Sequence, residues 1–340
     1  VPAAQCSARE HAVHGPGGQT LGFGELAARA AKLPMPDTAT LRMKAEADFR
    51  YVGQSLPIVD LEAMLAGEAV YGIDVQLPDM LYASIERSPW LQGKIESLES
   101  DAALAMAGVV DVVTLEAADG APGFNPIEGV AVLAENNWSA LRGRDALKLR
   151  WSASAHSEHS ATQYLDGLAA LVESGPGEVR RERGDVSAAL ERAEQMVRAT
   201  YRTHASMEPP VATARVAAGS CEIWACTQTP QATRKAVAEA LGLDVDAVVV
   251  HVTLLGGGFG RKSKPDFAVE AARLSSRAGR PVQVVWSRED DIRHDYFHAC
   301  SAQHFQGALD TQGQVTAWLA REAAPPIGAI FDTSMDMNSE

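Results

Sequence analysis

A glycine-rich segment is the part of the sequence whose residue types suggest chemistry most directly. It reads Gly256-Gly-Gly-Phe-Gly-Arg-Lys262, with four glycines in its first five positions, and lies between a predicted strand and a predicted helix. Glycines let backbone N–H groups approach a ligand closely, and the amino end of the following helix favours negatively charged atoms. The segment therefore indicates a binding loop, with a tight turn that holds no ligand as the alternative.

Two known phosphate-binding loops have a similar composition, and one residue argues against both. A P-loop places glycine immediately before Lys-Ser, but Arg261 precedes Lys262-Ser263 here. The dinucleotide-binding fingerprint needs glycine five residues after Gly256, and that position is again Arg261. A P-loop-like nucleotide site around Lys262 stays as an alternative hypothesis only.

Alternating apolar residues predict the elements that position this loop. Residues 245–255 are predicted to form a strand before it. Thr229 with Pro230 is typical of the start of a helix, and Gly242 is typical of its end. The same signals predict strands at 81–86, 109–115, 130–134, 147–151, 211–217, 221–227 and 282–287, helices at 24–32, 138–147, 161–173 and from Pro265 to just before Gly279, and a hairpin over 305–321.

Changes in this pattern divide the chain into four parts. Residues 1–66 are loosely patterned and are interpreted as a lead-in or linker. Residues 67–155 form a predicted compact α+β unit, 156–190 a linker with a short helix, and 191–340 a further domain. The first residue is Val rather than Met, so we expect the chain to be a piece of a longer protein.

Composition excludes several classes of partner. The net charge is −14, and nucleic acid needs a basic binding face, so we expect no nucleic-acid partner. No run of 18 apolar residues occurs, so no membrane span is expected in this chain, and no export signal is visible. The spacing of the cysteines is not typical of an iron–sulfur cluster, and we expect free, mostly buried thiols at Cys6, Cys221, Cys226 and Cys300.

The glycine-rich segment resembles the Gly-Gly-Gly-Phe-Gly signature of the xanthine dehydrogenase/aldehyde oxidoreductase family. Trp224-Ala-Cys-Thr-Gln228 lies 31 residues before Phe259 and resembles the Thr-Gln element that the family has at this spacing. The resemblance implies that Phe259 and Gly260 lie against a molybdenum centre and give a backbone N–H to a metal oxygen. It also implies that the Gln228 amide contacts the apical oxygen of the metal. The implied cofactor-binding residues are Gln228, Gly256, Gly257, Gly258, Phe259 and Gly260.

Other stretches extend the resemblance over about 67–325. Residues 69–74, 77–83 and 87–89 look like the family's hammerhead-like α/β domain, and 204–209 and 287–293 look like parts of its first molybdopterin-binding domain. The implied fold is α+β, with a hammerhead-like α/β domain over 67–155 followed by part of the molybdopterin-binding α+β domain over 191–340. Arg261 and the charged run after Ser287 are similar to bacterial isoquinoline 1-oxidoreductase beta subunits and membrane-linked aldehyde dehydrogenase large subunits.

The resemblance implies a subunit of a molybdenum hydroxylase. Such an enzyme hydroxylates an N-heteroaromatic ring (isoquinoline-like) or oxidises an aldehyde, with water as the oxygen source. Purine hydroxylases have a glutamate after the loop lysine, and Ser263 occupies that position here, so a purine substrate is not expected. The family's catalytic glutamate is expected beyond Glu340, so this chain alone is expected to be inactive.

The implied cofactor is molybdenum–molybdopterin in its cytosine dinucleotide form, bound by the full-length protein with no direct protein ligand to the metal. The [2Fe–2S] clusters are expected on a small electron-transfer partner subunit, with a cytochrome as a further candidate partner. Bacterial periplasm and cytoplasm are both compatible with the sequence. A non-catalytic assembly module that docks the iron–sulfur subunit is the other alternative.

Three further groups have structural interpretations. His204 and Glu208 have the spacing of a helical metal pair, but two prolines follow at once, so packing near the domain entrance is predicted instead. Trp224 is predicted to lie in the core. Residues 288–295 carry mixed charge and are interpreted as a salt-bridged surface corner, with contact to the substrate as the alternative.

Overall fold

The computed structural model of the chain describes residues 1–41, 43–117, 123–175, 177–185, 188, 206–294 and 301–325. By its internal contacts the chain divides into two units, Val1–Leu65 and Ala66–Glu340. The predicted elements and the binding loop lie in the second unit, apart from the short helix at 24–32.

The first unit is a small sheet with one helix. Its antiparallel strands are β1 (Ser7–Arg9), β2 (Ala12–His14) and β3 (Thr20–Gly22), and α1 (Phe23–Ala30) follows directly. This helix confirms the one predicted at 24–32. None of the described side chains of this unit is fully buried, so the unit has no core of its own. The short helix α2 (Leu61–Ala66) lies at the boundary.

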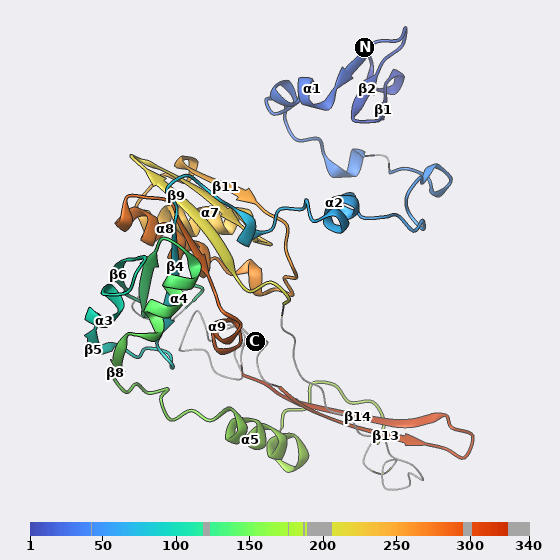
Figure 1. Ribbon diagram of the computed structural model, residues 1–340. Helices are drawn as coiled ribbons and strands as arrows, with labels where there is room; N and C mark the ends of the chain where they lie inside the picture. The colour runs from blue at the N-terminus through green and yellow to red at the C-terminus, as the bar shows by residue number, and fades with distance from the viewer. Residues whose placement is uncertain are drawn as a thin grey trace. The chain divides into compact units, whose positions relative to one another are not determined.

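The second unit contains the remaining strands and helices, and its architecture is α+β, as predicted (Figure 1). Its strands are β4 (Leu81–Arg87), β5 (Ile95–Glu99), β6 (Val109–Leu115), β7 (Gly129–Ala134), β8 (Lys148–Trp151), β9 (Val211–Ala217), β10 (Ser220–Ala225), β11 (Val248–Val252), β12 (Val282–Val285), β13 (Ala302–Leu309) and β14 (Val315–Ala323). Its helices are α3 (Asp101–Leu104), α4 (Asn137–Asp145), α5 (Ala161–Ser174), α7 (Pro230–Leu241), α8 (Asp266–Ala278) and α9 (Arg288–Arg293).

One sheet joins segments that are far apart in the sequence. Its seven strands have the order β11-β10-β9-β12-β4-β7-β6. The pairs β10–β11 and β4–β12 are parallel, and the other neighbours are antiparallel. The pairing of β12 with β4 therefore connects strands from the 67–155 region with strands from the 191–340 region in a continuous sheet.

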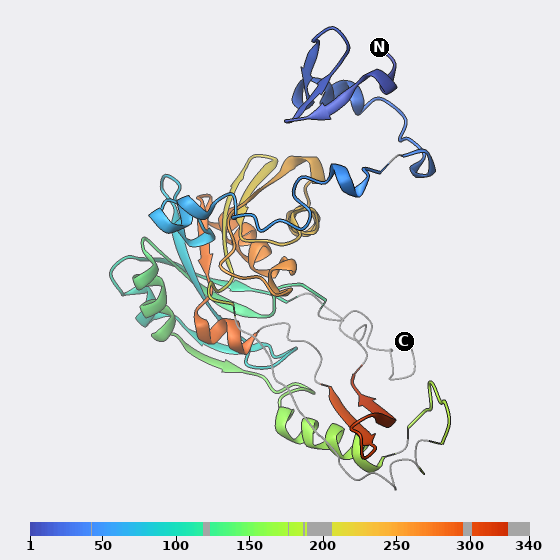
Figure 2. The ribbon, with the colours of Figure 1, turned by 90° about the vertical axis from the view of Figure 1, so that its right-hand side faces the viewer.

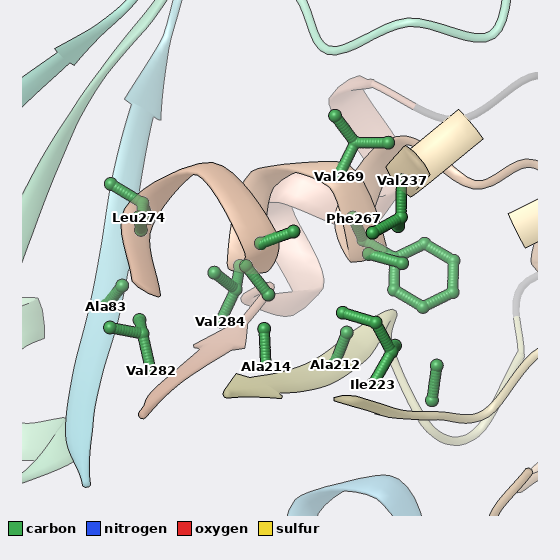
Figure 3. Close-up of a cluster of buried hydrophobic side chains, with 14 of the residues drawn as sticks. Ala83, Ala212, Ala214, Ile223, Val237, Phe267, Val269, Leu274, Val282 and Val284 are labelled. Atoms are coloured by element: carbon green, nitrogen blue, oxygen red, sulfur yellow. The ribbon is translucent and has the colours of Figure 1, made fainter. Parts of the chain in front are cut away.

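Helices cover both faces of this sheet. On one face, α7 and α8 pack over apolar residues of the central strands, and Figure 3 shows Leu274 of α8 above Val282 and Phe267 above Ile223. On the other face, α4 lies over β4 and β7, where Gly143 comes so close to Val132 that an added Cβ would lie 2.8 Å from a valine methyl group. The core therefore depends on small residues at the points where helices approach the strands.

Several element boundaries differ from the sequence prediction, and two are informative. The strand predicted over 245–255 begins only at Val248, because residues 245–247 form a 3-10 turn in which the Asp244 carboxylate accepts the Asp246 N–H at 2.8 Å. The helix predicted over 138–147 is α4, which ends at Asp145. The hairpin predicted over 305–321 is confirmed as β13–β14, and α5 packs along it in both views (Figure 2) through Leu168, Val172 and Ala323.

Candidate functional site

The candidate site lies at the edge of the sheet where its parallel strands end. β10 and β11 are parallel neighbours, with Ala225 opposite Val252. Gln228 follows β10, and the glycine-rich loop follows β11. Because parallel strands finish at the same edge, loops after them meet there. This explains why two motifs separated by 31 residues in sequence come together.

Direct hydrogen bonds join Gln228 to the loop. The backbone N–H of Gly260 donates to Gln228 Oε1 at 3.0 Å, and the backbone N–H of Gln228 donates to the Lys262 carbonyl at 2.9 Å. A backbone N–H can only donate, so the amide oxygen of Gln228 must face the loop and the NH2 group points away from it. The Gln228 side chain is exposed, so this NH2 group is available to a ligand.

The loop glycines are required by space and by backbone conformation. A Cβ on Gly256 would lie 2.5 Å from Glu208 Cβ, and one on Gly258 would lie 2.6 Å from the Gln228 amide carbon. Gly257 and Gly260 have φ values of +101° and +91°, a region that side chains disfavour. Four of the predicted site residues thus have a demonstrable need to be glycine.

Phe259 has an unusual backbone for a bulky residue. Its φ is +50°, in the left-handed region, and its side chain is 58% exposed. Such a conformation costs roughly 1–3 kcal/mol and is found mainly at functional sites. The ring therefore lies at the surface of the loop, beside Gly257, rather than in the core.

The site presents hydrogen-bond donors without a net positive charge. Within the described part of the chain, the N–H groups of Gly257 and Gly258 meet no protein acceptor, and the Gln228 NH2 group adds two more donors. The two buried cations that follow the loop, Arg261 and Lys262, are paired with Asp266 and Glu208. These donors fit oxygen atoms of a bound group, so the residues suit the oxygen-rich molybdenum–molybdopterin cofactor that the resemblance implies.

Glu208 anchors both ends of the loop. Its carboxylate accepts the N–H of Gly72 at 3.1 Å, the N–H of Gly256 at 2.9 Å and the ammonium group of Lys262 at 2.7 Å. The Lys262 side chain has no exposed surface, and that of Glu208 is 10% exposed. Glu208 has the structural role predicted for it, whereas His204 lies outside the described residues.

This arrangement argues against the P-loop alternative. A P-loop lysine must reach the phosphates of its nucleotide. Lys262 is instead buried, and its ammonium group is bound to Glu208. Ser263, the residue after it, also contributes to loop structure, since its hydroxyl donates to the Gly260 carbonyl and its own carbonyl accepts the Thr229 hydroxyl at 2.7 Å.

A buried network of charges beside the loop was not found by sequence reasoning. Arg87, at the end of β4, donates two hydrogen bonds to Glu270 of α8 at 3.0 and 2.7 Å, and Trp286 donates its indole N–H to the same carboxylate at 2.9 Å. Arg144 of α4 binds both carboxylate oxygens of Asp290 at 2.7 and 2.8 Å. The one signal in the sequence is that Arg87 and Glu270 lie in largely apolar segments, whereas Arg144 and Asp290 lie in charged ones.

Burial and ion pairing shift the pKa values of this network in opposite directions. Burial raises the pKa of Glu270 despite the opposing charge of Arg87. Burial also disfavours the charge of Asp290, but hydrogen bonds from Arg144 and the charge of Arg87 outweigh it, so the pKa of Asp290 is lowered. Burial, with the positive charge of Arg87, lowers the pKa of His294 to about 4.

One structural interpretation from the sequence is wrong, and another holds only in part. Trp224 is only partly buried, because it lies on the face of β10 opposite Ile223 and stacks on His251 with ring centroids 4.7 Å apart. The 288–294 segment is salt-bridged and partly at the surface, as predicted, since Glu289, Ile292 and Arg293 are exposed. It is also partly buried, because Asp290 and Asp291 of α9 are 2% and 3% exposed and form ion pairs with Arg144 and Arg288.

Comparisons with known proteins agree with this geometry. Residues 172–334 match the molybdopterin cofactor-binding domain family, and residues 66–141 match the a/b hammerhead domain of aldehyde oxidase and xanthine dehydrogenase. The chain is 30% identical over 313 residues to isoquinoline 1-oxidoreductase subunit beta of Brevundimonas diminuta, covering 84% of this chain and 38% of that protein. It is 29% identical over 334 residues to a membrane-bound aldehyde dehydrogenase of Gluconacetobacter polyoxogenes, covering 94% of this chain and 42% of that protein.

A solved structure gives the same fold. Quinoline 2-oxidoreductase from Pseudomonas putida 86 superposes with a TM-score of 0.59 at 19% identity, over 79% of this chain and 39% of that one. The chain spans about two fifths of the length of these relatives.

The fold and these matches define an a/b hammerhead domain together with a molybdopterin cofactor-binding domain. The chain belongs to the xanthine dehydrogenase/aldehyde oxidoreductase family, whose members include molybdenum hydroxylases, and the predicted family is confirmed. Among the described residues, no group of three His, Cys, Asp or Glu side chains is placed to hold a metal ion. In the same part of the chain, every helix is too short or too polar to cross a bilayer.

Proposed function

We propose that this chain supplies one wall of the molybdenum cofactor site in an oxidoreductase that hydroxylates an N-heteroaromatic ring or oxidises an aldehyde. The observation that supports the proposal is the convergence of the Gln228 amide with the 256–260 loop at one sheet edge, where the N–H groups of Gly257 and Gly258 meet no acceptor among the described residues. Relatives named for isoquinoline and for aldehyde oxidation match most of the chain, so both substrate classes are retained.

Each residue then has a defined task. The Gln228 NH2 group and the N–H groups of Gly257 and Gly258 donate hydrogen bonds to the cofactor, and Gly260 fixes the orientation of Gln228. The exposed Phe259 ring lies beside Gly257, where it would shield a bound cofactor from water. When bound, the cofactor supplies oxygen transfer from water to an electrophilic carbon and passes electrons onward.

The remaining parts of the proposal concern the whole protein. We infer the cytosine dinucleotide form of the cofactor, [2Fe–2S] clusters on a separate small subunit and a cytochrome as a further candidate acceptor. Relatives named as subunits support a multi-subunit enzyme. The catalytic carboxylate is expected outside this chain. A purine substrate is disfavoured because Ser263 offers no carboxylate and its hydroxyl is used by Gly260.

The test measures molybdenum per polypeptide by mass spectrometry. The full-length protein is produced with its partner subunits in a host that makes molybdopterin, as wild type and as Gln228→Ala. Gln231→Ala is the matched control, because Gln231 is an exposed glutamine at the start of α7. We expect near-stoichiometric metal in wild type and control, and metal loss or loss of turnover with isoquinoline and aldehydes in Q228A. Metal-free, well-folded wild type would favour the assembly-module alternative.

A further inference from the structure

Arg261 directly follows the glycine-rich loop, but the proposed binding of the cofactor gives its side chain no role. It follows Gly260 directly, yet only 2% of the residue is exposed. Its guanidinium group forms a two-point ion pair with Asp266, the first residue of α8, with both N–O distances at 2.9 Å. Planar two-point pairing of this kind fixes orientation as well as distance. The Arg261 side chain therefore ties the end of the glycine-rich loop to the start of α8.

The same guanidinium also stacks on an aromatic ring. Its central carbon lies 4.8 Å from the centre of a Trp286 ring, and Arg87 lies 3.8 Å from a Trp286 ring centre. Trp286 cannot shift freely, because its indole N–H is bound to Glu270, which is itself held by Arg87. The loop is thus connected through Arg261 and Trp286 to the buried charge network at the end of β4.

We propose that Arg261 is a positioning residue that holds the 256–260 loop against Gln228, so that the Gln228 NH2 group and the loop N–H groups keep the direction in which the cofactor needs them. This inference rests on the proposed function for the identity of the ligand. The geometric part of the inference is that Arg261 controls the Gly260–Gln228 hydrogen bond. This part does not depend on the proposed function. Lysine cannot replace arginine here, because an ammonium group lacks both the fork and the flat face.

The experiment compares Arg261→Lys with Arg215→Lys. Arg215 is the matched control, because it also pairs with a carboxylate, Glu222 at 2.8 Å, and lies 5.5 Å from the ring centre of a tryptophan, Trp224, but its side chain is 46% exposed. Amide hydrogen exchange of cofactor-free protein is followed on peptides that cover the loop. In R261K we expect exchange at Gly260 to rise by about tenfold while β10 and α8 peptides stay unchanged, since one charged two-point contact is lost. R215K should exchange like wild type.

A second readout uses the molybdenum-loaded protein. In R261K we expect near-wild-type metal content, an altered electron paramagnetic resonance spectrum of the reduced metal, and a kcat that falls with KM unchanged. A purely structural Arg261 would lower metal content and stability but leave the spectrum of the remaining loaded sites unchanged, and that result would overturn the proposal. Wild-type exchange at Gly260 in folded R261K would overturn it as well.

A further variant keeps the test decisive if R261K does not fold. Asp266→Asn retains the arginine but removes the charge that orients it, so the same rise in exchange at Gly260 is expected, and its absence contradicts the proposal. The exchange experiment needs no cofactor, so its failure is distinct from failure of the proposed function. The proposed function is tested separately, by the metal content of wild type and Q228A.

Discussion

Replacing Lys262 with methionine tests the anchoring of the loop most sharply. Methionine keeps most of the side-chain length and apolar contact but removes the ammonium group that lies 2.7 Å from Glu208. The Glu208 carboxylate would then stay 10% exposed with only the N–H groups of Gly72 and Gly256 to stabilise its charge. Removing one partner of a buried ion pair costs about 3–5 kcal/mol. Because two backbone donors remain, we expect the lower end, about 3 kcal/mol.

Urea unfolding followed by circular dichroism measures this loss. Lys148→Met is the matched control, because Lys148 pairs with Glu99 at 3.0 Å while both side chains are at least 70% exposed. Losing this exposed ion pair should change the free energy of unfolding by less than about 1 kcal/mol. The double variant Glu208→Gln with Lys262→Met should be more stable than the sum of the single effects predicts, because neither charge is then left alone.

Two results would refute this reasoning. One is a K262M protein as stable as K148M, which would mean that the pair is not buried in solution. The other is a double variant whose loss equals the sum of the single losses, which would mean that the two groups do not interact. Nucleotide binding that disappears in K262M would in addition revive the P-loop alternative.

Three further predictions follow from single residues. His294 has a folded-state pKa of about 4, below its ordinary value, so the stability it contributes is complete above pH 6.5 and is lost as the pH falls toward 4. The free energy of unfolding should therefore drop by about 2 kcal/mol between pH 7 and pH 5, and this component should be absent in His294→Gln; an unchanged pH profile in the variant contradicts the assignment. The hydroxyl of Ser84 is buried in β4 and has no hydrogen-bond partner among the described residues. Ser84→Ala should therefore be neutral or should stabilise the fold by up to about 1 kcal/mol in urea unfolding. Clear destabilisation would indicate that the hydroxyl has a partner. Gly258→Ala would place a Cβ 2.6 Å from the Gln228 amide and displace the amide, so turnover per molybdenum should fall by roughly 100-fold. Gly167→Ala is the control and should leave turnover unchanged, because the space around its Cβ is open. Equal turnover in both variants would show that the position of Gln228 is unimportant.

Local patterns in the sequence were sufficient for most of the elements around the site. Pro230 and Gly242 bound α7 as predicted, with Gly242 in the left-handed conformation at φ +63°. The strands predicted over 211–217 and 221–227 are β9 and β10, which pair as an antiparallel hairpin. These features depend on residues a few positions apart, so propensity and periodicity report them directly.

Contacts between distant segments could not be predicted in the same way. The pairing of β12 with β4 joins Val282 to Leu81, and no periodicity within either strand specifies its partner. The three groups bound by Glu208 likewise come from distant segments, with Gly72 136 positions away. Trp224 was misplaced because alternation identifies two faces of a strand but does not show which of them a helix covers. Here α7 and α8 cover the face of Ile223 instead.

The account's central claim is that Gln228 and the 256–260 loop face the molybdenum cofactor. Its most direct test is a cryo-electron microscopy structure of the full-length, molybdenum-loaded protein with its partner subunits. We predict the Gln228 NH2 group within about 3 Å of a cofactor oxygen, with Gly260 still donating to Gln228 Oε1. A cofactor bound elsewhere, with Gln228 and the loop in contact with solvent or protein alone, would contradict the claim.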